Sequence, residues 1–219
     1  MEKADVGRKI LGANETCALK NKQFLARHGK RCFNMISSPG SGKTSLLVRT
    51  ITDIGQSLRI GVIEGDLQTD IDAERIRATR APAIQINTEG ACHLSAKQVS
   101  QALEGLPIEN LDLVIIENVG NLVCPSAFEL GEDGKIVVLS VAEGDDKPVK
   151  YPGIFAKSKV LLVNKIDLLK GGMVDFDLDR VFADARRLNR DIEIFPVSAK
   201  TGEGMQKWYD WLTSQARSH

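Results

Sequence analysis

A glycine-rich stretch between an apolar run and a helical pattern constrains the fold of this chain most strongly. Residues 32–36 are apolar enough for a buried strand, and they lead into residues 37–42 and then into a helix beginning near Lys43. Two closely spaced glycines let backbone N–H groups curl around phosphate oxygens, and the positive end of the helix adds to the attraction. The stretch predicts a phosphate-binding loop, whose nucleotide-binding residues are Gly40, Ser41, Gly42, Lys43, Thr44 and Ser45. A serine, Ser37, stands where such loops usually open with glycine, and a plain turn followed by a capping threonine is the alternative.

Strand and helix signals alternate along the rest of the chain. Apolar runs that suit buried strands lie at residues 32–36, 60–64, 83–86, 113–117, 136–141, 160–164 and 193–197. Segments of helical length lie at 8–28, 44–57, 70–79, 93–105, 175–189 and 203–216, and residues 142–153 form the longest loop-like stretch. Strands that are apolar on both faces and separated by helices imply a parallel sheet covered on both sides. We expect an α/β fold with a mainly parallel sheet of about seven strands and helices on both faces.

The composition excludes several classes of protein. The 29 basic and 29 acidic side chains cancel, so neither nucleic acid nor a membrane surface is expected as a partner. The apolar runs are far too short to cross a bilayer. Residues 1–5 lack an apolar signal core, and four cysteines in such a chain favour free thiols or metal ligands. We therefore expect a cytoplasmic location.

The tetrapeptide Asn164-Lys165-Ile166-Asp167 follows an apolar run and predicts selectivity for guanine. A carboxylate at Asp167 can accept hydrogen bonds from the N1–H and the exocyclic amine of guanine, whereas adenine has no donor at N1. Asn164 and Lys165 would brace the base and the loop beneath it. The stretch Ser198-Ala199-Lys200, after the last apolar run, would line the same base. The remaining alternative is a P-loop ATPase or kinase, which would be indifferent to guanine and to Asp167.

Acidic residues near strand ends suggest a magnesium site beside the phosphates. Glu117 ends an apolar run, and Gly120 would offer its N–H to the γ-phosphate. Asp66 and Asp72 are further carboxylates for the metal or the attacking water, although either could cap a helix. The predicted catalytic residues are Lys43, Asp66, Asp72, Glu117 and Gly120, and the predicted Mg²⁺ ligands are Thr44, Asp66, Asp72 and Glu117. Arg75, Arg77 and Arg80 read as a solvated helix face.

Two cysteines and one histidine form a second candidate site. Cys92 and His93 are adjacent, and Cys124 follows Gly120 by four residues. Two thiolates and an imidazole suit Zn²⁺ or Ni²⁺, and three ligands leave one tetrahedral position open. Buried structural cysteines beside a capping histidine would give the same pattern. The place of Cys124 favours metal, since γ-phosphate hydrolysis at Gly120 could move this ligand.

The string Glu117-Asn118-Val119-Gly120-Asn121-Leu122-Val123-Cys124-Pro125, together with the phosphate loop, Cys92-His93 and the guanine tetrapeptide, resembles the hydrogenase nickel-incorporation GTPases of the HypB family. The resemblance covers roughly residues 8–215 and implies a P-loop NTPase of the SIMIBI class that dimerises with GTP. It implies a slow, Mg²⁺-dependent GTPase and nickel delivery for [NiFe] hydrogenase maturation. It also implies a Zn²⁺ or Ni²⁺ site at Cys92, His93 and Cys124. The implied partners are a second copy of the chain, a small zinc-containing accessory protein (HypA-like) and the hydrogenase large subunit.

The chain is expected to divide into an N-terminal helix over residues 1–30, packed on a GTP-binding domain over residues 31–219. Some relatives carry an N-terminal cysteine motif or a histidine-rich tract for nickel; residues 1–5 have no cysteine and the chain has 3 histidines, so those functions are not expected here. Two alternatives stay open. One is a urease-type nickel GTPase, whose Cys-Pro-His motif differs from Cys124-Pro125-Ser126. The other is a GTP switch that binds no metal.

Overall fold

The structure, a computed structural model, describes residues 3–66, 71–88 and 90–217, with side chains from residue 11 onward. Its described strands form one seven-stranded sheet in the order β3-β2-β4-β1-β5-β6-β7, and every neighbouring pair is parallel. The strands are β1 (Arg31–Ser37), β2 (Ile60–Asp66), β3 (Ala83–Asn87), β4 (Leu113–Glu117), β5 (Gly134–Ser140), β6 (Ser158–Asn164) and β7 (Glu193–Pro196). The predicted α/β fold with a parallel sheet is confirmed.

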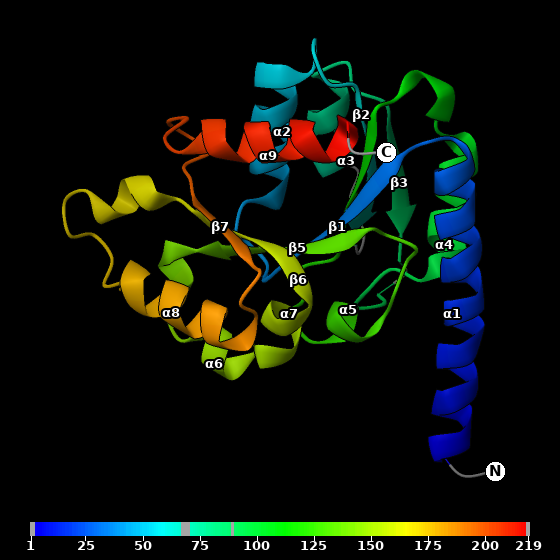
Figure 1. The fold of residues 1–219 in the computed structure, drawn as a ribbon, viewed down its shortest axis with the longest axis horizontal. Helices are drawn as coiled ribbons and strands as arrows, with labels where there is room; N and C mark the ends of the chain where they lie inside the picture. The colour runs from blue at the N-terminus through cyan, green and yellow to red at the C-terminus, as the bar shows by residue number, and fades with distance from the viewer. Residues whose placement is uncertain (1–2, 67–70, 89, 218–219) are drawn as a thin grey trace.

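Helices cover both faces of the sheet (Figure 1). One face carries α2 (Lys43–Ile54), α3 (Ile71–Arg77) and α9 (Met205–Arg217). The other face carries α1 (Lys3–Arg27) and α4 (Ala96–Gly105) over one half of the sheet, and α7 (Pro152–Lys157) and α8 (Leu178–Leu188) over the other half. The remaining short elements are α5 (Cys124–Ala127), α6 (Lys147–Lys150) and the 3₁₀ turns η1 (Ile108–Asn110), η2 (Val141–Glu143) and η3 (Ile166–Leu169).

The core consists of three apolar clusters, because successive strand residues point to opposite faces of the sheet. Phe33 packs beneath α2 and α9, whereas its neighbour Cys32 packs beneath α1 and α4. Trp208 is fully buried on α9, and its indole N–H donates to Thr50 Oγ1 on α2 at 3.0 Å. This bond satisfies the polar group that the buried indole brings with it and ties the two helices together.

Two segments differ from the sequence prediction. Residues 142–153 were expected to be a loop but include helical turns in η2, α6 and the start of α7. Pro148 and Pro152 lie in the first turns of α6 and α7, where a missing N–H costs nothing and the fixed φ angle favours a helix. The helix expected from residue 93 begins instead at Ala96, because Ser95 forms a capping box with Gln98.

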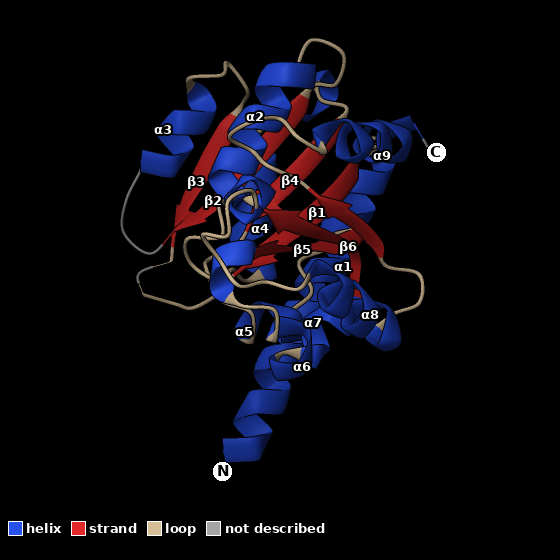
Figure 2. Ribbon diagram, turned by 90° about the vertical axis from the view of Figure 1, so that its left-hand side faces the viewer, coloured by secondary structure: helices blue, strands red, loops and turns tan. Residues whose placement is uncertain are grey.

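The topology places the carboxyl ends of the strands at one edge of the sheet, visible where the arrows meet the loops in Figure 2. Strand β1 lies between β4 and β5; the chain forms β2, β3 and β4 on one side of it and then crosses to form β5, β6 and β7 on the other. Ligand sites in such sheets lie at this switch point, outside the carboxyl ends of the strands. None of the helices in the described part of the chain has the length and apolar character that a membrane crossing requires.

Candidate nucleotide and metal sites

The phosphate loop joins β1 to α2 and is built for close contact with a ligand. Gly42 has φ 92°, a left-handed conformation that side chains disfavour. A Cβ added there would lie 2.7 Å from Asn164 Nδ2, so a side chain would also collide with the guanine tetrapeptide. Glycine is therefore required at this position for two independent reasons. The first turn of α2 then points its free N–H groups toward the crevice.

Lys43 is buried in the crevice between the phosphate loop and β4. Its Nζ donates to Ser37 Oγ at 2.9 Å and lies 4.0 Å from Glu117 Oε1. Ser37 ends β1 in a strand conformation, so the serine in place of the usual glycine needs no special backbone freedom. Its hydroxyl instead holds the lysine ammonium in place.

Two carboxylates from neighbouring strands face the phosphate loop. Glu64 on β2 and Glu117 on β4 are paired in the sheet register, and both are buried. Thr44 Oγ1 donates to Glu117 Oε1 at 2.9 Å. Burial, followed by the adjacent Glu117 charge, raises the pKa of Glu64 strongly, and burial likewise raises the pKa of Glu117 despite the nearby Lys43 charge. Glu64 was missed as a candidate because its strand partner lies far along the chain; its only sequence signal is a charge inside an apolar strand.

Asp66 and Asp72 lie in the same region. Asp66 ends β2, and Asp72 on α3 forms an ion pair with Arg75 at 3.0 Å. Arg75, Arg77 and Arg80 are exposed, as the sequence predicts, and Arg75 also donates to Ser45 Oγ at 3.0 Å. A cavity of about 450 Å³ collects these groups with the phosphate loop; it is lined by Gly40, Gly42, Lys43, Thr44, Ser45, Glu64, Asp66, Asp72, Arg75, Glu117 and Gly120, among others.

The residues present fit a magnesium ion bound with the nucleotide phosphates. Among the described residues, Glu64 Oε2 and Glu117 Oε2 are buried oxygens without a hydrogen-bond partner. Such oxygens are costly unless a cation or solvent satisfies them. A hydroxyl from Thr44 and two carboxylates form the kind of oxygen-rich donor set that Mg²⁺ prefers beside phosphates. The chemistry of this corner therefore suits a divalent cation.

A second cavity of about 220 Å³ lies beside the phosphate loop and is lined in part by the guanine tetrapeptide. It is lined by Gly42, Ser45, Asn164, Lys165, Asp167, Leu168, Ala199 and Lys200. Ser198 Oγ donates to Asp167 Oδ1 at 2.7 Å, which orients the carboxylate. Asp167, in the 3₁₀ turn η3 that follows β6, supplies the carboxylate among the residues that line this cavity. The size of this cavity suits a flat heterocycle.

Asn164 and Lys165 brace the phosphate loop. Asn164 Nδ2 donates to Ser41 O at 2.9 Å, while its Oδ1 accepts from the Ala199 N–H at 3.2 Å. Lys165 Nζ donates to Gly40 O at 2.7 Å. These bonds join three loops that lie far apart in the sequence. The cavity for the base and the cavity for the phosphates are thereby held in one fixed relation.

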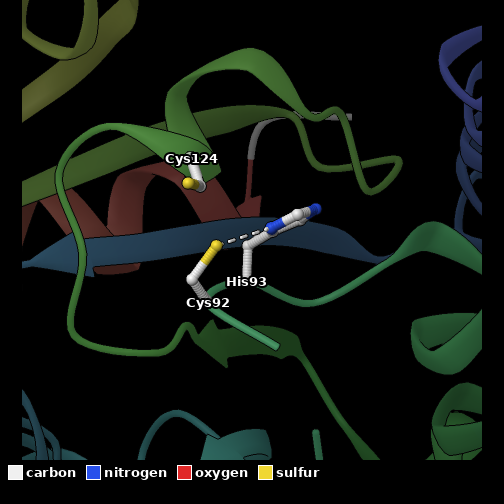
Figure 3. A group of neighbouring side chains, drawn as sticks. All are labelled: Cys92, His93 and Cys124. Atoms are coloured by element: carbon white, nitrogen blue, oxygen red, sulfur yellow. Dashed lines mark hydrogen bonds between the residues drawn. The ribbon is translucent and has the colours of Figure 1, made fainter. Parts of the chain in front are cut away.

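Cys92, His93 and Cys124 come together at one site (Figure 3). Their possible ligand atoms all lie within 4.8 Å of one another. Cys92 and His93 come from the loop before α4, and Cys124 begins α5 in the segment that follows β4. The two sulfur atoms face each other in Figure 3, and Cys92 Sγ lies 3.5 Å from His93 Nδ1. The imidazole also packs on the Phe128 ring at a centroid distance of 3.9 Å.

The geometry of this group fits a soft divalent metal. Bonds of about 2.3 Å to sulfur and 2.0–2.1 Å to nitrogen place tetrahedral ligands about 3.5–4 Å apart, close to the spread observed here. Burial lowers the pKa of His93, which favours the neutral imidazole that a metal requires. A hydrogen bond with Cys124, together with burial, raises the pKa of Cys92. The Cys92 thiol therefore keeps its proton in the absence of a metal, and a bound cation would release that proton.

A family model described as "CobW/HypB/UreG, nucleotide-binding domain" matches residues 32–196. The chain is 52% identical over 211 residues to the hydrogenase maturation factor HypB of Rhizobium leguminosarum bv. viciae, covering 96% of this chain and 70% of that protein.

Two solved structures are similar along nearly their whole length. The crystal structure of the hydrogenase maturation factor HypB from Archaeoglobus fulgidus has a TM-score of 0.87 and 37% identity, covering 94% of this chain and 100% of that one. The crystal structure of HypB from Helicobacter pylori in complex with nickel has a TM-score of 0.88 and 38% identity, covering 94% and 95% respectively.

Proposed function

The chain belongs to the CobW/HypB/UreG family, in its HypB branch, and on that basis we propose that it is a GTP-hydrolysing metallochaperone that delivers nickel during [NiFe] hydrogenase maturation. One observation carries the proposal. A single short segment, residues 117–124, contributes Glu117 to the phosphate cavity and Cys124 to the Cys92–His93–Cys124 site. Nucleotide and metal can therefore influence each other through eight consecutive residues.

The nucleotide would lie across the two cavities. Asp167 would accept the N1–H and the amine of guanine, and the loop at Ser198, Ala199 and Lys200 would close over the base. Backbone N–H groups of the phosphate loop and the Lys43 ammonium would hold the phosphates. The hydrogen bonds of Asn164 and Lys165 to the phosphate loop support this arrangement, because they hold the base and phosphate regions together.

Hydrolysis would take place at the Glu64–Glu117 corner of the phosphate cavity. Mg²⁺, when bound, would neutralise charge that develops on the phosphoryl oxygens. Thr44, Glu64, Glu117 and the carboxylates Asp66 and Asp72 would hold it, directly or through water. Gly120 would donate its N–H to the γ-phosphate. Release of that phosphate after hydrolysis would let the residues that follow Gly120 move. A slow reaction is expected, because the cavity offers positioning rather than an obvious strong base.

Nickel would be the cargo, bound at Cys92, His93 and Cys124, with Zn²⁺ as the competing ion. Three ligands leave room for a ligand from a second subunit, so we propose a GTP-dependent homodimer that completes the site. A HypA-like accessory protein and the hydrogenase large subunit are the proposed partners upstream and downstream of the transfer. A cytoplasmic setting suits this exchange of a thiolate-bound metal.

We further propose that the chain from residue 31 onward acts as one GTP-binding unit, with α1 (Lys3–Arg27) packed on it. Two side chains on α1 support this division. Asn14 Nδ2 donates to Glu129 O at 2.7 Å, and Asn21 Nδ2 donates to Leu130 O at 2.9 Å. These bonds attach the helix to the loop that precedes β5.

Size-exclusion chromatography with light scattering tests the proposal. The chain is run with GDP or with a non-hydrolysable GTP analogue, each with and without Ni²⁺, in the presence of Mg²⁺. We expect a dimer with the GTP analogue and a further shift with Ni²⁺. A dimer that forms with the GTP analogue but is unchanged by Ni²⁺ would be consistent with a GTPase and would contradict the metallochaperone role.

A further inference from the structure

The metal site is assembled from two stretches of backbone that side-chain hydrogen bonds connect. One stretch is the loop before α4, which carries Cys92 and His93, and the other follows β4 and carries Cys124. Two asparagines of the second stretch, Asn118 and Asn121, reach across to the first. Their surroundings differ, because Asn118 is buried whereas Asn121 is half-buried.

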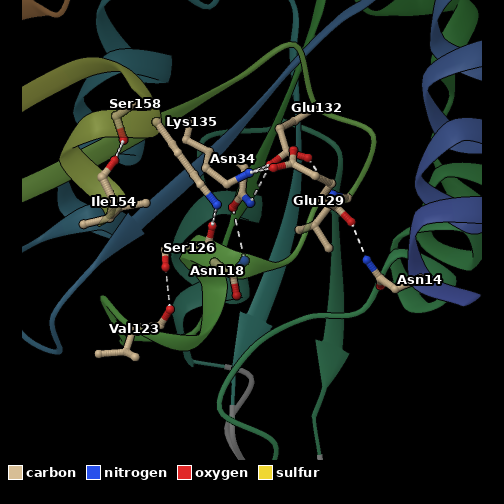
Figure 4. A network of polar contacts seen from close by, with 12 residues as sticks. Asn14, Asn34, Asn118, Val123, Ser126, Glu129, Glu132, Lys135, Ile154 and Ser158 are labelled. Atoms are coloured by element: carbon tan, nitrogen blue, oxygen red, sulfur yellow. Dashed lines mark hydrogen bonds and ion pairs between the residues drawn. The ribbon is translucent and has the colours of Figure 1, made fainter. Parts of the chain in front are cut away.

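Asn118 belongs to a fixed part of the site. Its Oδ1 accepts from the Leu94 N–H at 3.2 Å, and its Nδ2 donates to Asn34 Oδ1 at 3.1 Å. Asn34 in turn donates to Glu132 Oε1 at 3.1 Å, and that carboxylate also binds Lys135 at 2.7 Å (Figure 4). All these side chains are buried, so the network is costly to disturb.

The start of α4 is fixed from its other side as well. The Ala96 N–H donates to Asn14 Oδ1 at 2.8 Å, and Asn21 Nδ2 donates to Ala96 O at 2.8 Å. Both asparagines lie on α1. The residues immediately after Cys92 and His93 are thus held by the sheet and by a neighbouring helix, so these two ligands lie on a fixed platform.

The segment that follows Asn118 lies close to the phosphate loop. A Cβ added at Gly120 would lie 3.0 Å from three atoms of Pro39, including its N and Cα. The backbone of Gly120 therefore lies so near the loop that would surround the phosphates that no side chain fits between them. Movement of the phosphate loop at Pro39 would therefore displace Gly120 and, through the chain, the residue that follows it.

That next residue is Asn121, whose side chain bonds the backbone at both cysteines. Its Oδ1 accepts from the N–H groups of Val123 at 2.8 Å and Cys124 at 3.4 Å. Its Nδ2 donates to Cys92 O at 3.4 Å. The two bonds at 3.4 Å are at the long end for N–H···O bonds, so a shift of a few tenths of an ångström makes or breaks them.

We propose that Asn121 is the positioning residue that couples the nucleotide cavity to the Cys92–His93–Cys124 site. Movement of the Gly120 peptide on γ-phosphate binding or release turns the adjacent Asn121, which resets the distance between the two cysteine backbones. Because the Cys92 side is anchored, Cys124 is the ligand that moves. This inference rests on the proposed function, in which one chain binds GTP and a metal at these sites.

The test is the Ni²⁺ affinity of the full chain with GDP and with a non-hydrolysable GTP analogue, measured by competition with a coloured chelator. The readout is the ratio of the two affinities, since a general effect on metal binding cancels in it. For the wild type we expect a ratio of about 5 to 150, the usual range of coupling between sites. For Asn121→Ala we expect a ratio within about twofold of one.

A second variant and a control make the test specific. Asn121→Asp keeps the oxygen that caps Val123 and Cys124 but loses the donor to Cys92 O, so its ratio should also fall toward one. The aspartate variant provides the test if the alanine variant does not fold. A thermal melt followed by circular dichroism would reveal such a failure to fold. Asn110→Ala, an exposed asparagine on η1 away from both sites, should keep the wild-type ratio.

The outcomes separate the two proposals. A wild-type ratio of one would overturn the nucleotide-linked function and this inference with it. A large wild-type ratio that persists in both Asn121 variants would overturn only the role of Asn121. A variant that weakens Ni²⁺ binding or lowers the melting temperature equally in both nucleotide states, with the ratio intact, would show that the residue is merely structural.

Discussion

Replacing Asp167 with asparagine should change which base the chain prefers. The carboxylate lies beside the smaller cavity, and Ser198 Oγ donates to its Oδ1 at 2.7 Å. Guanine presents two donors to this carboxylate, its N1–H and its exocyclic amine. An asparagine would keep one acceptor oxygen but turn an NH₂ group toward the second donor. The substitution preserves size and shape, so the change isolates hydrogen-bonding chemistry.

The magnitude follows from the bonds that are lost. A hydrogen bond to a charged group contributes about 1.5–3 kcal/mol, and a donor facing a donor adds an unsatisfied group. A loss of about 3 kcal/mol corresponds to roughly a 150-fold rise in the Kd for GDP. Xanthine carries a carbonyl where guanine carries the amine, and that oxygen can accept from the new amide. XDP should therefore bind the variant more tightly than it binds the wild type.

The assay is isothermal titration calorimetry of nucleotide-free protein with GDP, XDP and ADP. Asp210→Asn, at an exposed position on α9, serves as the matched control and should leave all three affinities unchanged. Unaltered GDP affinity together with no gain for XDP would refute the assignment of this cavity to the base. Equal binding of ADP and GDP by the wild type would refute it as well.

Three further changes probe other parts of the chain. Lys43→Ala removes charged hydrogen bonds to the phosphates worth about 1.5–3 kcal/mol each, so GDP binding measured by calorimetry should weaken by about 100-fold or more. Cys124→Ser replaces a thiolate by a poor ligand and should weaken Ni²⁺ binding, measured by chelator competition, by about 10- to 100-fold. The control Cys17→Ser, on α1, should leave Ni²⁺ binding unchanged. Equal Ni²⁺ affinities of the two variants would exclude Cys92, His93 and Cys124 as the metal site. Lys135→Met leaves the buried Glu132 carboxylate without its cation and should cost about 3–5 kcal/mol in urea unfolding; Lys150→Met, at an exposed ion pair, should unfold like the wild type.

The fold was predictable because its signals are local. Strands that are apolar on both faces and alternate with helices predict a parallel sheet, whatever the sequence of the connecting loops. Residues 142–153 misled the prediction because glycine and proline mark loops in general, whereas Pro148 and Pro152 here lie in first helical turns. Local signals thus located the strands well and the short helices poorly.

The candidate sites were predictable only as far as their motifs reach. The phosphate loop, the guanine tetrapeptide and the Cys92–His93–Cys124 group each combine residue types whose chemistry is recognisable in sequence. The pairing of Glu64 with Glu117, by contrast, depends on β2 lying beside β4, which no local pattern states. The contact of Asn121 with the Cys92 carbonyl likewise depends on two loops meeting across the end of the sheet.

The most direct test of the account is a thermodynamic cycle on the wild-type chain. Ni²⁺ affinity is measured with GDP and with a non-hydrolysable GTP analogue, and the affinities of both nucleotides are then measured with and without Ni²⁺. Since coupling between two sites is reciprocal, the account predicts that the nucleotide preference changes on adding Ni²⁺ by the same factor as the metal affinity changes between nucleotides. A factor of one in both directions would contradict the account, because the two sites would then bind their ligands independently.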